Sequence, residues 1–154
     1  MGILTSSKIF LTNKKKLLLW LRDNDQPIND PNKWDLPGRD IKLNVSPAET
    51  ISVDLTERFN IHLESKPFLL GKTHSSIGIE HYIFIYYASD SEIQNMHISK
   101  WGQEASFFDI DKLDQVELTP PLKIYLSKYG KYLTECLQKS LSYSKIDPLK
   151  LGLY

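Results

Sequence analysis

WDLPGRDIKLNVSPAETISVDLTERFNI, residues 34–61, begins with a short apolar run that ends in the turn-forming sequence Leu36-Pro37-Gly38. A loop follows, and the sequence Ser-Pro-Ala-Glu then marks the start of a helix. Ser46 can accept a hydrogen bond from a free backbone amide, Pro47 suits the first helical position, and Glu49 stands where a capping box has an acid. The stretch therefore predicts a turn, a loop and a helix that begins at Pro47.

The predicted helix ends at about Phe59, because Asn60 is one of the few non-glycine residues that tolerates a left-handed C-cap. Asp54 and Glu57 lie three residues apart, so their carboxylates share one face of the helix. Two acids beside a turn form a candidate site for a divalent cation. The alternative is a solvent-exposed face, since Arg58 follows Asp54 by four residues and can form an ordinary surface ion pair with it. Spacing alone leaves both interpretations open.

Length and composition indicate one ordinary globular domain, residues 1–154, with 41% hydrophobic and 25% charged residues. The 19 basic and 19 acidic side chains balance, so net charge gives no support for binding to specific nucleic acids or to a membrane surface. The first residues do not resemble a signal peptide, and no apolar run is long enough to span a bilayer. The single cysteine, Cys136, cannot form an internal disulfide. We therefore expect a cytoplasmic protein.

Most of the remaining chain is predicted to form strands, followed by a second helix. The expected strands cover residues 8–12, 17–22, 68–73, 81–88 and 105–108. Residues 23–33 and 90–100 are expected to be loops, and a long helix begins at Pro120, with apolar residues at three- and four-residue steps. The apolar tail, residues 146–154, either packs back on the domain or meets a partner subunit. This order predicts an α+β domain with a mixed sheet between two helices.

The turn, the capped acidic helix, and the later sequence Gly102-Gln103-Glu104 with Phe107-Phe108 resemble the Nudix hydrolase family over nearly the whole chain. The family's box is a glycine, five residues, a glutamate, seven residues, then Arg-Glu-apolar-any-Glu-Glu-any-Gly-apolar, which falls on residues 39–61 here. The resemblance implies a Nudix-type α/β/α sandwich. It also implies a hydrolase that uses Mg²⁺ or Mn²⁺ to cleave the phosphoanhydride of a nucleoside diphosphate linked to another group. A nucleotide-type small molecule would be its partner, and a homodimer is left open because dimers are frequent among relatives.

The box of this chain is degenerate. Its opening glycine is replaced by Arg39, its first glutamate by Val45, its arginine by Val53, the second of its paired glutamates by Arg58, and its last glycine by Asn60. In the family the first glutamate and the arginine support the loop and helix through an ion pair. Their joint loss suggests that an apolar contact replaces this ion pair here.

The resemblance assigns the metal to Asp54, Glu57 and Glu104, and catalysis to Glu57 and Glu104. Three carboxylates are enough for one octahedral ion that is completed by water and substrate phosphates. Arg58 places a cation where the family has a metal-binding carboxylate. It either pairs with the acids in the metal's place or turns outward and leaves a weaker site.

Candidate phosphate contacts are Arg22, Arg39 and the turn glycine Gly38, against the alternative that both arginines are ordinary solvent-facing charges. The leading hypothesis is thus a metal-dependent Nudix hydrolase that the degenerate box weakens. The alternative is a catalytically inactive Nudix-fold module that binds a nucleotide or a protein, as Arg58 and the lost box residues suggest. A strand-rich interaction protein that dimerises through its apolar tail is a third hypothesis.

Overall fold

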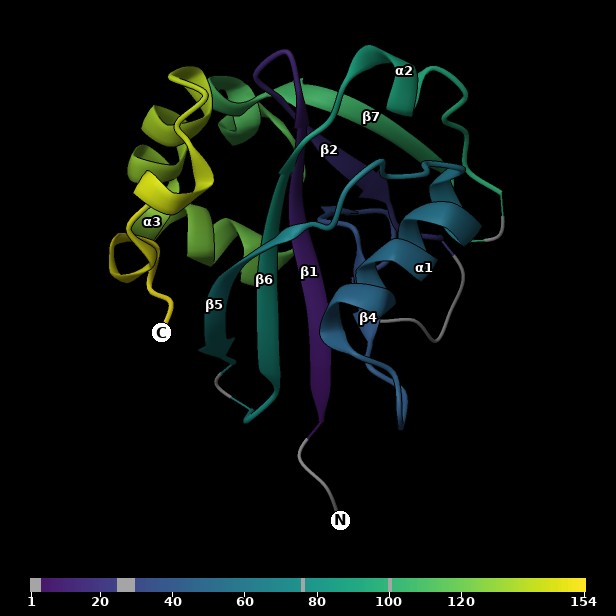
Figure 1. Ribbon diagram of the computed structural model, residues 1–154, viewed down its shortest axis with the longest axis horizontal. Helices are drawn as coiled ribbons and strands as arrows, with labels where there is room; N and C mark the ends of the chain where they lie inside the picture. Colours follow the sequence, from purple (N-terminus) through teal and green to yellow (C-terminus); the bar gives the residue numbers. More distant parts are fainter. Residues whose placement is uncertain (1–3, 25–29, 76, 100) are drawn as a thin grey trace.

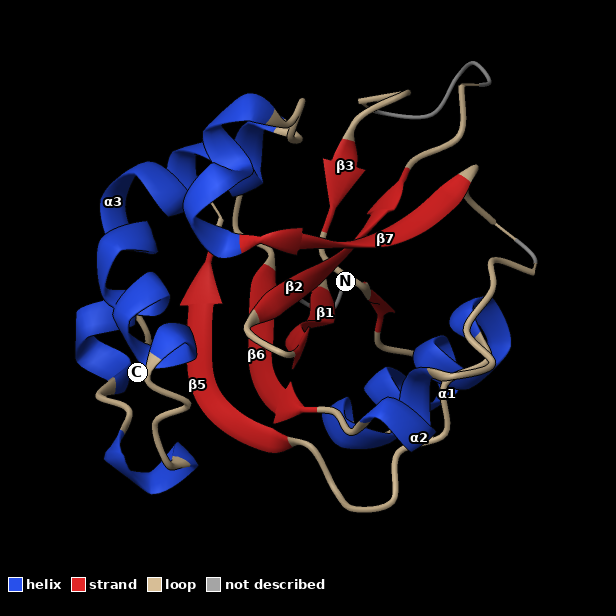
Figure 2. Ribbon diagram, turned by 90° about the horizontal axis from the view of Figure 1, so that it is seen from above, coloured by secondary structure: helices blue, strands red, loops and turns tan. Residues whose placement is uncertain are grey.

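A computed structural model of the protein describes residues 4–24, 30–75, 77–99 and 101–154. Within these residues the chain forms a 7-stranded mixed sheet with helices on both faces, as the sequence predicts. In Figures 1 and 2, α1 covers one face and α3 the other. The strands are β1 (Thr5–Asn13), β2 (Lys16–Leu21), β3 (Trp34–Asp35), β4 (Gly38–Asp40), β5 (Phe68–His74), β6 (Glu80–Tyr87) and β7 (Glu104–Asp109). The helices are α1 (Pro47–Phe59), α2 (Asp90–Ile93) and α3 (Pro120–Gln138), with 3₁₀ turns η1 (Ile110–Gln115), η2 (Tyr143–Lys145) and η3 (Pro148–Leu151).

The long strand β1 organises the sheet. It pairs in parallel with β6 over its whole length, from Thr5 opposite Glu80 to Thr12 opposite Tyr87. On its other side it pairs antiparallel with β4 near its start and with β2 near its end. The sheet order is β3-β2-β1-β6-β5, with β7 added to β2. Because β4 lies beside the first half of β1, the Leu-Pro-Gly turn is fixed against the middle of the sheet.

Two hydrophobic clusters hold the layers together. On one face, residues of α1 such as Ile51, Leu55 and Phe59 pack against strand residues that include Ile9 and Phe84. On the other face, α3, η1 and the C-terminal tail pack on residues of β1, β2, β5 and β6. The mixed sheet therefore separates two cores, as expected of an α/β/α sandwich.

The end signals of α1 act as the sequence predicts. The Ser46 side chain accepts a hydrogen bond from the Glu49 amide at 3.1 Å, and Asn60 adopts a left-handed conformation with φ 53°. Ser46 and Asn60 thus define the two ends of the helix. The buried residues of α1 are Thr50, Ile51, Asp54, Leu55, Arg58 and Phe59. Since they recur at steps of three and four, they form one stripe that faces the sheet, and this stripe contains two charged residues.

Two short elements differ from the sequence-based expectation. Strand β4 is formed by Gly-Arg-Asp in a region that was expected to be a loop, because pairing with β1 overrides its low strand propensity. Helix α2 lies inside the predicted loop 90–100, and a capping box of Ser89 and Glu92 stabilises its start. Part of the other expected loop, residues 25–29, and Lys100 lie outside the described residues.

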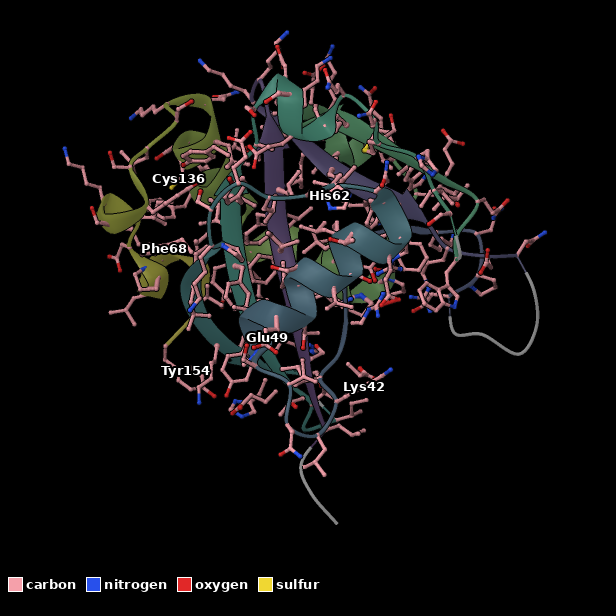
Figure 3. The ribbon with its side chains drawn as sticks, turned by 45° about the vertical axis from the view of Figure 1, so that its right-hand side comes forward. Lys42, Glu49, His62, Phe68, Cys136 and Tyr154 are labelled. Carbon is pink, nitrogen blue, oxygen red and sulfur yellow. The ribbon has the colours of Figure 1, made fainter. Side chains whose placement is uncertain are left out.

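The C-terminal tail packs back on its own domain. Leu151 and Leu153 are buried, and Tyr154 exchanges two backbone hydrogen bonds with Lys72 of β5, at 2.9 and 3.1 Å. Figure 3 shows Tyr154 beside this edge strand. In the part of the chain that the structure describes, no helix is both long and apolar enough to cross a membrane.

Candidate functional site

The site begins at Gly38, which lies closer to β1 than any other residue type could. Its φ is +149°, and a Cβ built there would lie 2.1 Å from the backbone oxygen of Ser7. Both polar backbone atoms of Gly38 point to the box helix. Its amide donates to Asp54 Oδ2 at 2.9 Å, and its carbonyl accepts from Arg58 Nη2 at 2.7 Å. The turn is therefore bonded to α1 through two charged side chains.

Asp54 is the centre of the site, with a side chain that is only 1% exposed. Its two oxygens accept hydrogen bonds from the amide of Gly38, from Arg39 Nε at 3.0 Å, and from Arg58 Nη2 at 2.6 and 2.7 Å. The carboxylate is thus surrounded by donors from the turn and from its own helix. Charge-assisted hydrogen bonds of this kind are stronger than neutral ones.

Arg58 is buried with Asp54, and its side chain is 5% exposed. Nη2 lies within 2.7 Å of three oxygen atoms, both carboxylate oxygens of Asp54 and the carbonyl oxygen of Gly38. The guanidinium also lies over the Trp20 ring, 4.0 Å from its centroid. Burial lowers the pKa of Arg58, and the Asp54 carboxylate opposes this shift by stabilising the charged form. Arg58 Nη2 is thus a positively charged group with three oxygen atoms around it, as a bound cation would have.

Arg39 is the second cation of the site. Its Nη1 lies 3.7 Å from Glu57 Oε2, so the residue joins Asp54 to Glu57. Its guanidinium lies 5.1 Å from the centroid of the Trp101 ring, in the range of a cation–π contact. Among the described residues, Arg39 Nη2 is buried without a hydrogen-bond partner, and so is Arg58 Nε.

The segment before β7 covers the end of α1. The amides of His97 and Ser99 donate to the carbonyls of Phe59 and Arg58, at 3.1 and 3.0 Å, and the Ser99 hydroxyl donates to the carbonyl of Glu57. These bonds satisfy carbonyls that a helix leaves free at its C-terminus. Farther along the chain, the Trp101 ring lies beside the Arg39 guanidinium, and β7 then begins at Glu104.

The predicted metal ligands are only partly brought together. Asp54 and Glu57 meet through Arg39, and the Glu57 side chain is 37% exposed. Glu104 is the first residue of β7, opposite Leu21, and it is exposed. Within the described ranges, no group of three or more His, Cys, Asp and Glu residues is arranged to hold a metal ion. With both oxygens of Asp54 bonded to guanidinium groups, the residues present do not fit a divalent cation in this arrangement.

The remaining sequence-based candidates lie around this network. Gly38 contributes both of its backbone polar atoms to it, as described above. Arg22 lies 5.6 Å from the Trp20 ring centroid and 3.9 Å from Asp35, which also pairs with Lys8 at 3.4 Å. Both predicted phosphate-binding arginines are therefore mostly buried, at 24% and 21% exposure, rather than ordinary solvent-facing charges. Their role in ligand binding stays a prediction.

Arg58 pairs with Asp54, which is one of the two arrangements that the sequence left open for it. The two residues hold the turn to α1 through the backbone of Gly38. The expected apolar contact in place of the family's ion pair stays a prediction, and Val53 is 40% exposed. The bond between Arg39 and Asp54 was not predicted, although an arginine at the position of the box glycine was the available signal.

Two cavities lie away from these charged residues. One of about 680 Å³ lies between η1 and α3, and its lining includes Leu113, Leu126 and Gly130. The other, of about 470 Å³, lies beside Pro47 and Phe68 at the opposite end of α1. Neither of these two cavities is lined by Asp54 or Glu57, so both lie outside the candidate site.

Comparison with known proteins identifies the fold. No family model matches the sequence, and no curated protein matches it. Among solved structures, a mutT/nudix family protein from Listeria innocua has a TM-score of 0.72, at 17% identity over 92% of this chain and 99% of that chain. The NUDIX domain of Shewanella oneidensis NrtR, complexed with ADP ribose, has a TM-score of 0.65 at 17% identity over 92% and 90% of the two chains. An ADP-ribose pyrophosphatase from Streptococcus suis has a TM-score of 0.61 at 15% identity over 92% and 94%.

These similarities identify the fold of the protein. The protein is an α+β domain with a mixed sheet between helices, and this sheet with its helices has the Nudix fold of the MutT/Nudix hydrolases. The resemblance recognised in the sequence is confirmed at this level. At identities of 15% to 17%, the similarity extends to the fold and not to an activity.

Proposed function

We propose that this chain is a Nudix-fold module that binds a nucleotide-type ligand without metal-dependent hydrolysis. The observation that carries the proposal is the position of Arg58 Nη2, within 2.7 Å of both oxygens of Asp54 and of the Gly38 carbonyl. The degenerate box thus places a tethered cation on the carboxylate that the resemblance assigns to the metal.

Charge supports this proposal. A divalent cation is selected by several negative oxygen ligands, whereas here Asp54 and Glu57 are balanced by Arg39 and Arg58. A metal ion at Asp54 would have to displace a buried guanidinium. Leaving one partner of a buried pair uncompensated costs about 3–5 kcal/mol. Metal binding would therefore be opposed by the loss of an existing interaction.

The ligand class is inferred from the fold. The NUDIX domain of NrtR, which is similar in fold, has been solved with ADP ribose bound. We propose a ligand of the same chemical class, a nucleoside diphosphate linked to another group. Arg22, Arg39 and the Gly38 turn are the proposed contacts to its phosphates. Binding of a protein instead of a nucleotide remains the competing form of this proposal.

A substrate and ligand panel tests the proposal. Nucleotide sugars, dinucleotides, ADP-ribose and nucleoside triphosphates are incubated with Mg²⁺ or Mn²⁺ to detect turnover, and titrated with EDTA present to detect binding. We expect saturable binding of at least one nucleotide in EDTA and no turnover. Metal-dependent turnover of any compound would overturn the proposal. The absence of all nucleotide binding would point to the protein-binding form.

A metal-dependent pyrophosphohydrolase is the second candidate. The exposure of Glu57, at 37%, and the fold shared with an ADP-ribose pyrophosphatase favour it. Asp54, Glu57 and Glu104 would then hold Mg²⁺ or Mn²⁺ after Arg58 had moved aside, and the ion would polarise the substrate diphosphate. If turnover is observed, Glu57→Gln and Glu104→Gln test this assignment. Activity that survives Glu57→Gln would exclude it.

A further inference from the structure

We infer that Arg39 presents a preorganised guanidinium edge that binds a phosphoryl oxyanion directly, with no metal ion between them. The inference deepens the proposed function and rests on it for the identity of the natural ligand. It concerns a residue that replaces the box glycine, so it is specific to this chain.

The inner side of the Arg39 guanidinium is fixed. Nε donates to Asp54 Oδ1 at 3.0 Å, and Cζ lies over the Trp101 ring, 5.1 Å from its centroid. Asp54 is itself held by Arg58 and by the turn amide. A guanidinium that is already oriented loses little conformational entropy when it binds a ligand. The remaining edge, formed by Nη1 and Nη2, is the one that can bind two oxygens of a phosphate in a fork.

That edge is poorly used by the described protein atoms. Nη2 has no hydrogen-bond partner among them, and Nη1 has an ion pair of 3.7 Å with Glu57, close to the limit for such a contact. A buried donor of a charged group that lacks a partner carries a desolvation cost that a ligand oxygen can relieve. Nη2 is buried, so a ligand oxygen reaches it only when neighbouring side chains move, whereas the Glu57 side chain beside Nη1 is 37% exposed.

The charges leave Arg39 available for an anion. Arg58 contacts both oxygens of Asp54 and neutralises it at close range. Arg39 therefore shares Asp54 with Arg58, and Glu57 is a second carboxylate at the longer distance of 3.7 Å. A phosphoryl group that displaces Glu57 exchanges a weak, partly solvated ion pair for a charge-assisted bidentate contact. The geometry therefore favours an oxyanion over a cation at this edge.

Inorganic pyrophosphate is the probe that tests the inference. It is titrated by calorimetry in EDTA at low ionic strength, where screening is weak, with acetate as a second arm that separates phosphoryl from carboxylate recognition. Arg39→Lys keeps the charge but removes the fork, and we expect it to weaken pyrophosphate binding about 10- to 100-fold. Lys42→Gln is the matched control. It removes one positive charge from the exposed loop before α1, where Figure 3 shows Lys42 apart from the helix, and binding should be unchanged.

Glu57→Gln provides an independent variant, because it removes the competing carboxylate and leaves Arg39 in place. We expect it to tighten pyrophosphate binding several-fold. Equal affinity in wild type and in folded Arg39→Lys, or no tightening in Glu57→Gln, would overturn the inference, as would wild-type protein that does not bind pyrophosphate or that prefers acetate. The proposed function is judged separately. Nucleotide binding that is insensitive to Arg39→Lys would preserve it, whereas pyrophosphate binding without nucleotide binding would preserve only the inference.

Discussion

Asp54 and Arg58 lie one turn apart on α1 and form an ion pair that is closed to solvent, with side-chain exposures of 1% and 5%. The i,i+4 spacing is that of an ordinary surface pair, but the stripe of the helix on which it lies faces the sheet. The pair also closes the Leu-Pro-Gly turn onto the helix through the backbone of Gly38. A single interaction thus has both a structural role and a position at the centre of the box.

The contributions of Asp54 and Arg58 to the free energy of unfolding should depend strongly on each other. We expect Asp54→Ala and Arg58→Ala each to lower the free energy of unfolding by about 3–5 kcal/mol, because each leaves the other buried charge without its closest partner. The double variant should lose less than the sum. Urea denaturation of the four proteins measures this coupling. Additive losses would show that the pair does not interact as described. Asp90→Asn, in the exposed pair with Lys14, is the control and should change stability little.

Replacing the tethered cation with a carboxylate should create a metal site. In Arg58→Glu the new side chain would join Asp54 and the Gly38 carbonyl, and three oxygen groups attract a hard cation. We expect the variant to be destabilised without metal, since two carboxylates would face each other, and to be rescued by Mn²⁺. Calorimetry and thermal denaturation with and without Mn²⁺ measure this effect. Arg58→Gln, which removes the cation without adding a ligand, is the reference, and equal Mn²⁺ affinity in both variants would contradict the expectation.

Gly38→Ala should destabilise the fold in two ways. A backbone with φ +149° is unfavourable for alanine, and the added Cβ would lie 2.1 Å from the oxygen of Ser7. The backbone conformation alone costs about 1–3 kcal/mol. Gly78→Ala separates the two effects, because Gly78 has φ +85° but no atom within 4 Å of the added Cβ. A larger loss of unfolding free energy at Gly38 than at Gly78 is expected, and equal losses would rule out the steric effect.

Stability should fall on mild acidification because of His81. Burial, and then the charge of Lys8, lower the pKa of His81, and Asp35 and Asp40 oppose this only in part. The unfolded chain keeps a histidine pKa of about 6.5. Between the lowered folded pKa and about 6.5 the unfolded state therefore binds more protons, so stability is complete above this window and declines as the pH falls through it.

The measurement is the urea midpoint of wild type and His81→Gln between about pH 5 and about pH 8. The variant should lose this part of the pH dependence. It also removes the 2.5 Å hydrogen bond between His81 Nδ1 and Ser6 Oγ, so the slope with pH is the informative quantity and the absolute stability is not. An unchanged slope in His81→Gln would contradict the assignment.

Local signals in the sequence were sufficient for the framework of the site. Ser46 and Asn60 define the ends of α1 because caps act through hydrogen bonds with immediate neighbours. The strand at β6 follows from its aromatic and β-branched residues. The order of these elements was enough to predict an α+β domain with a sheet between two helices, and the resemblance to the Nudix family then predicted the Nudix fold.

The charged network could not be predicted in the same way. Spacing places Asp54 and Arg58 together, but whether their stripe faces water or the sheet depends on how the whole helix packs. The partners Gly38 and Arg39 are brought in by β4, which has only three residues and forms because β1 offers an edge. The contact of Trp20 with Arg58 joins β2 to α1 across the core. Contacts of this kind depend on tertiary structure, so the sequence around each residue gives little signal of them.

The backbone pair of Tyr154 and Lys72 also bears on solubility. An edge strand with free amides and carbonyls is a template for strands of other molecules, and proteins that leave such edges open tend to aggregate. Here the chain's own last residues occupy the donor and acceptor of Lys72 on the outer side of β5. Gly71 allows the tail to approach, since a Cβ there would lie 3.0 Å from Leu153 and from the Tyr154 oxygen. At Lys72 the tail therefore closes the edge of β5 to strands of other molecules.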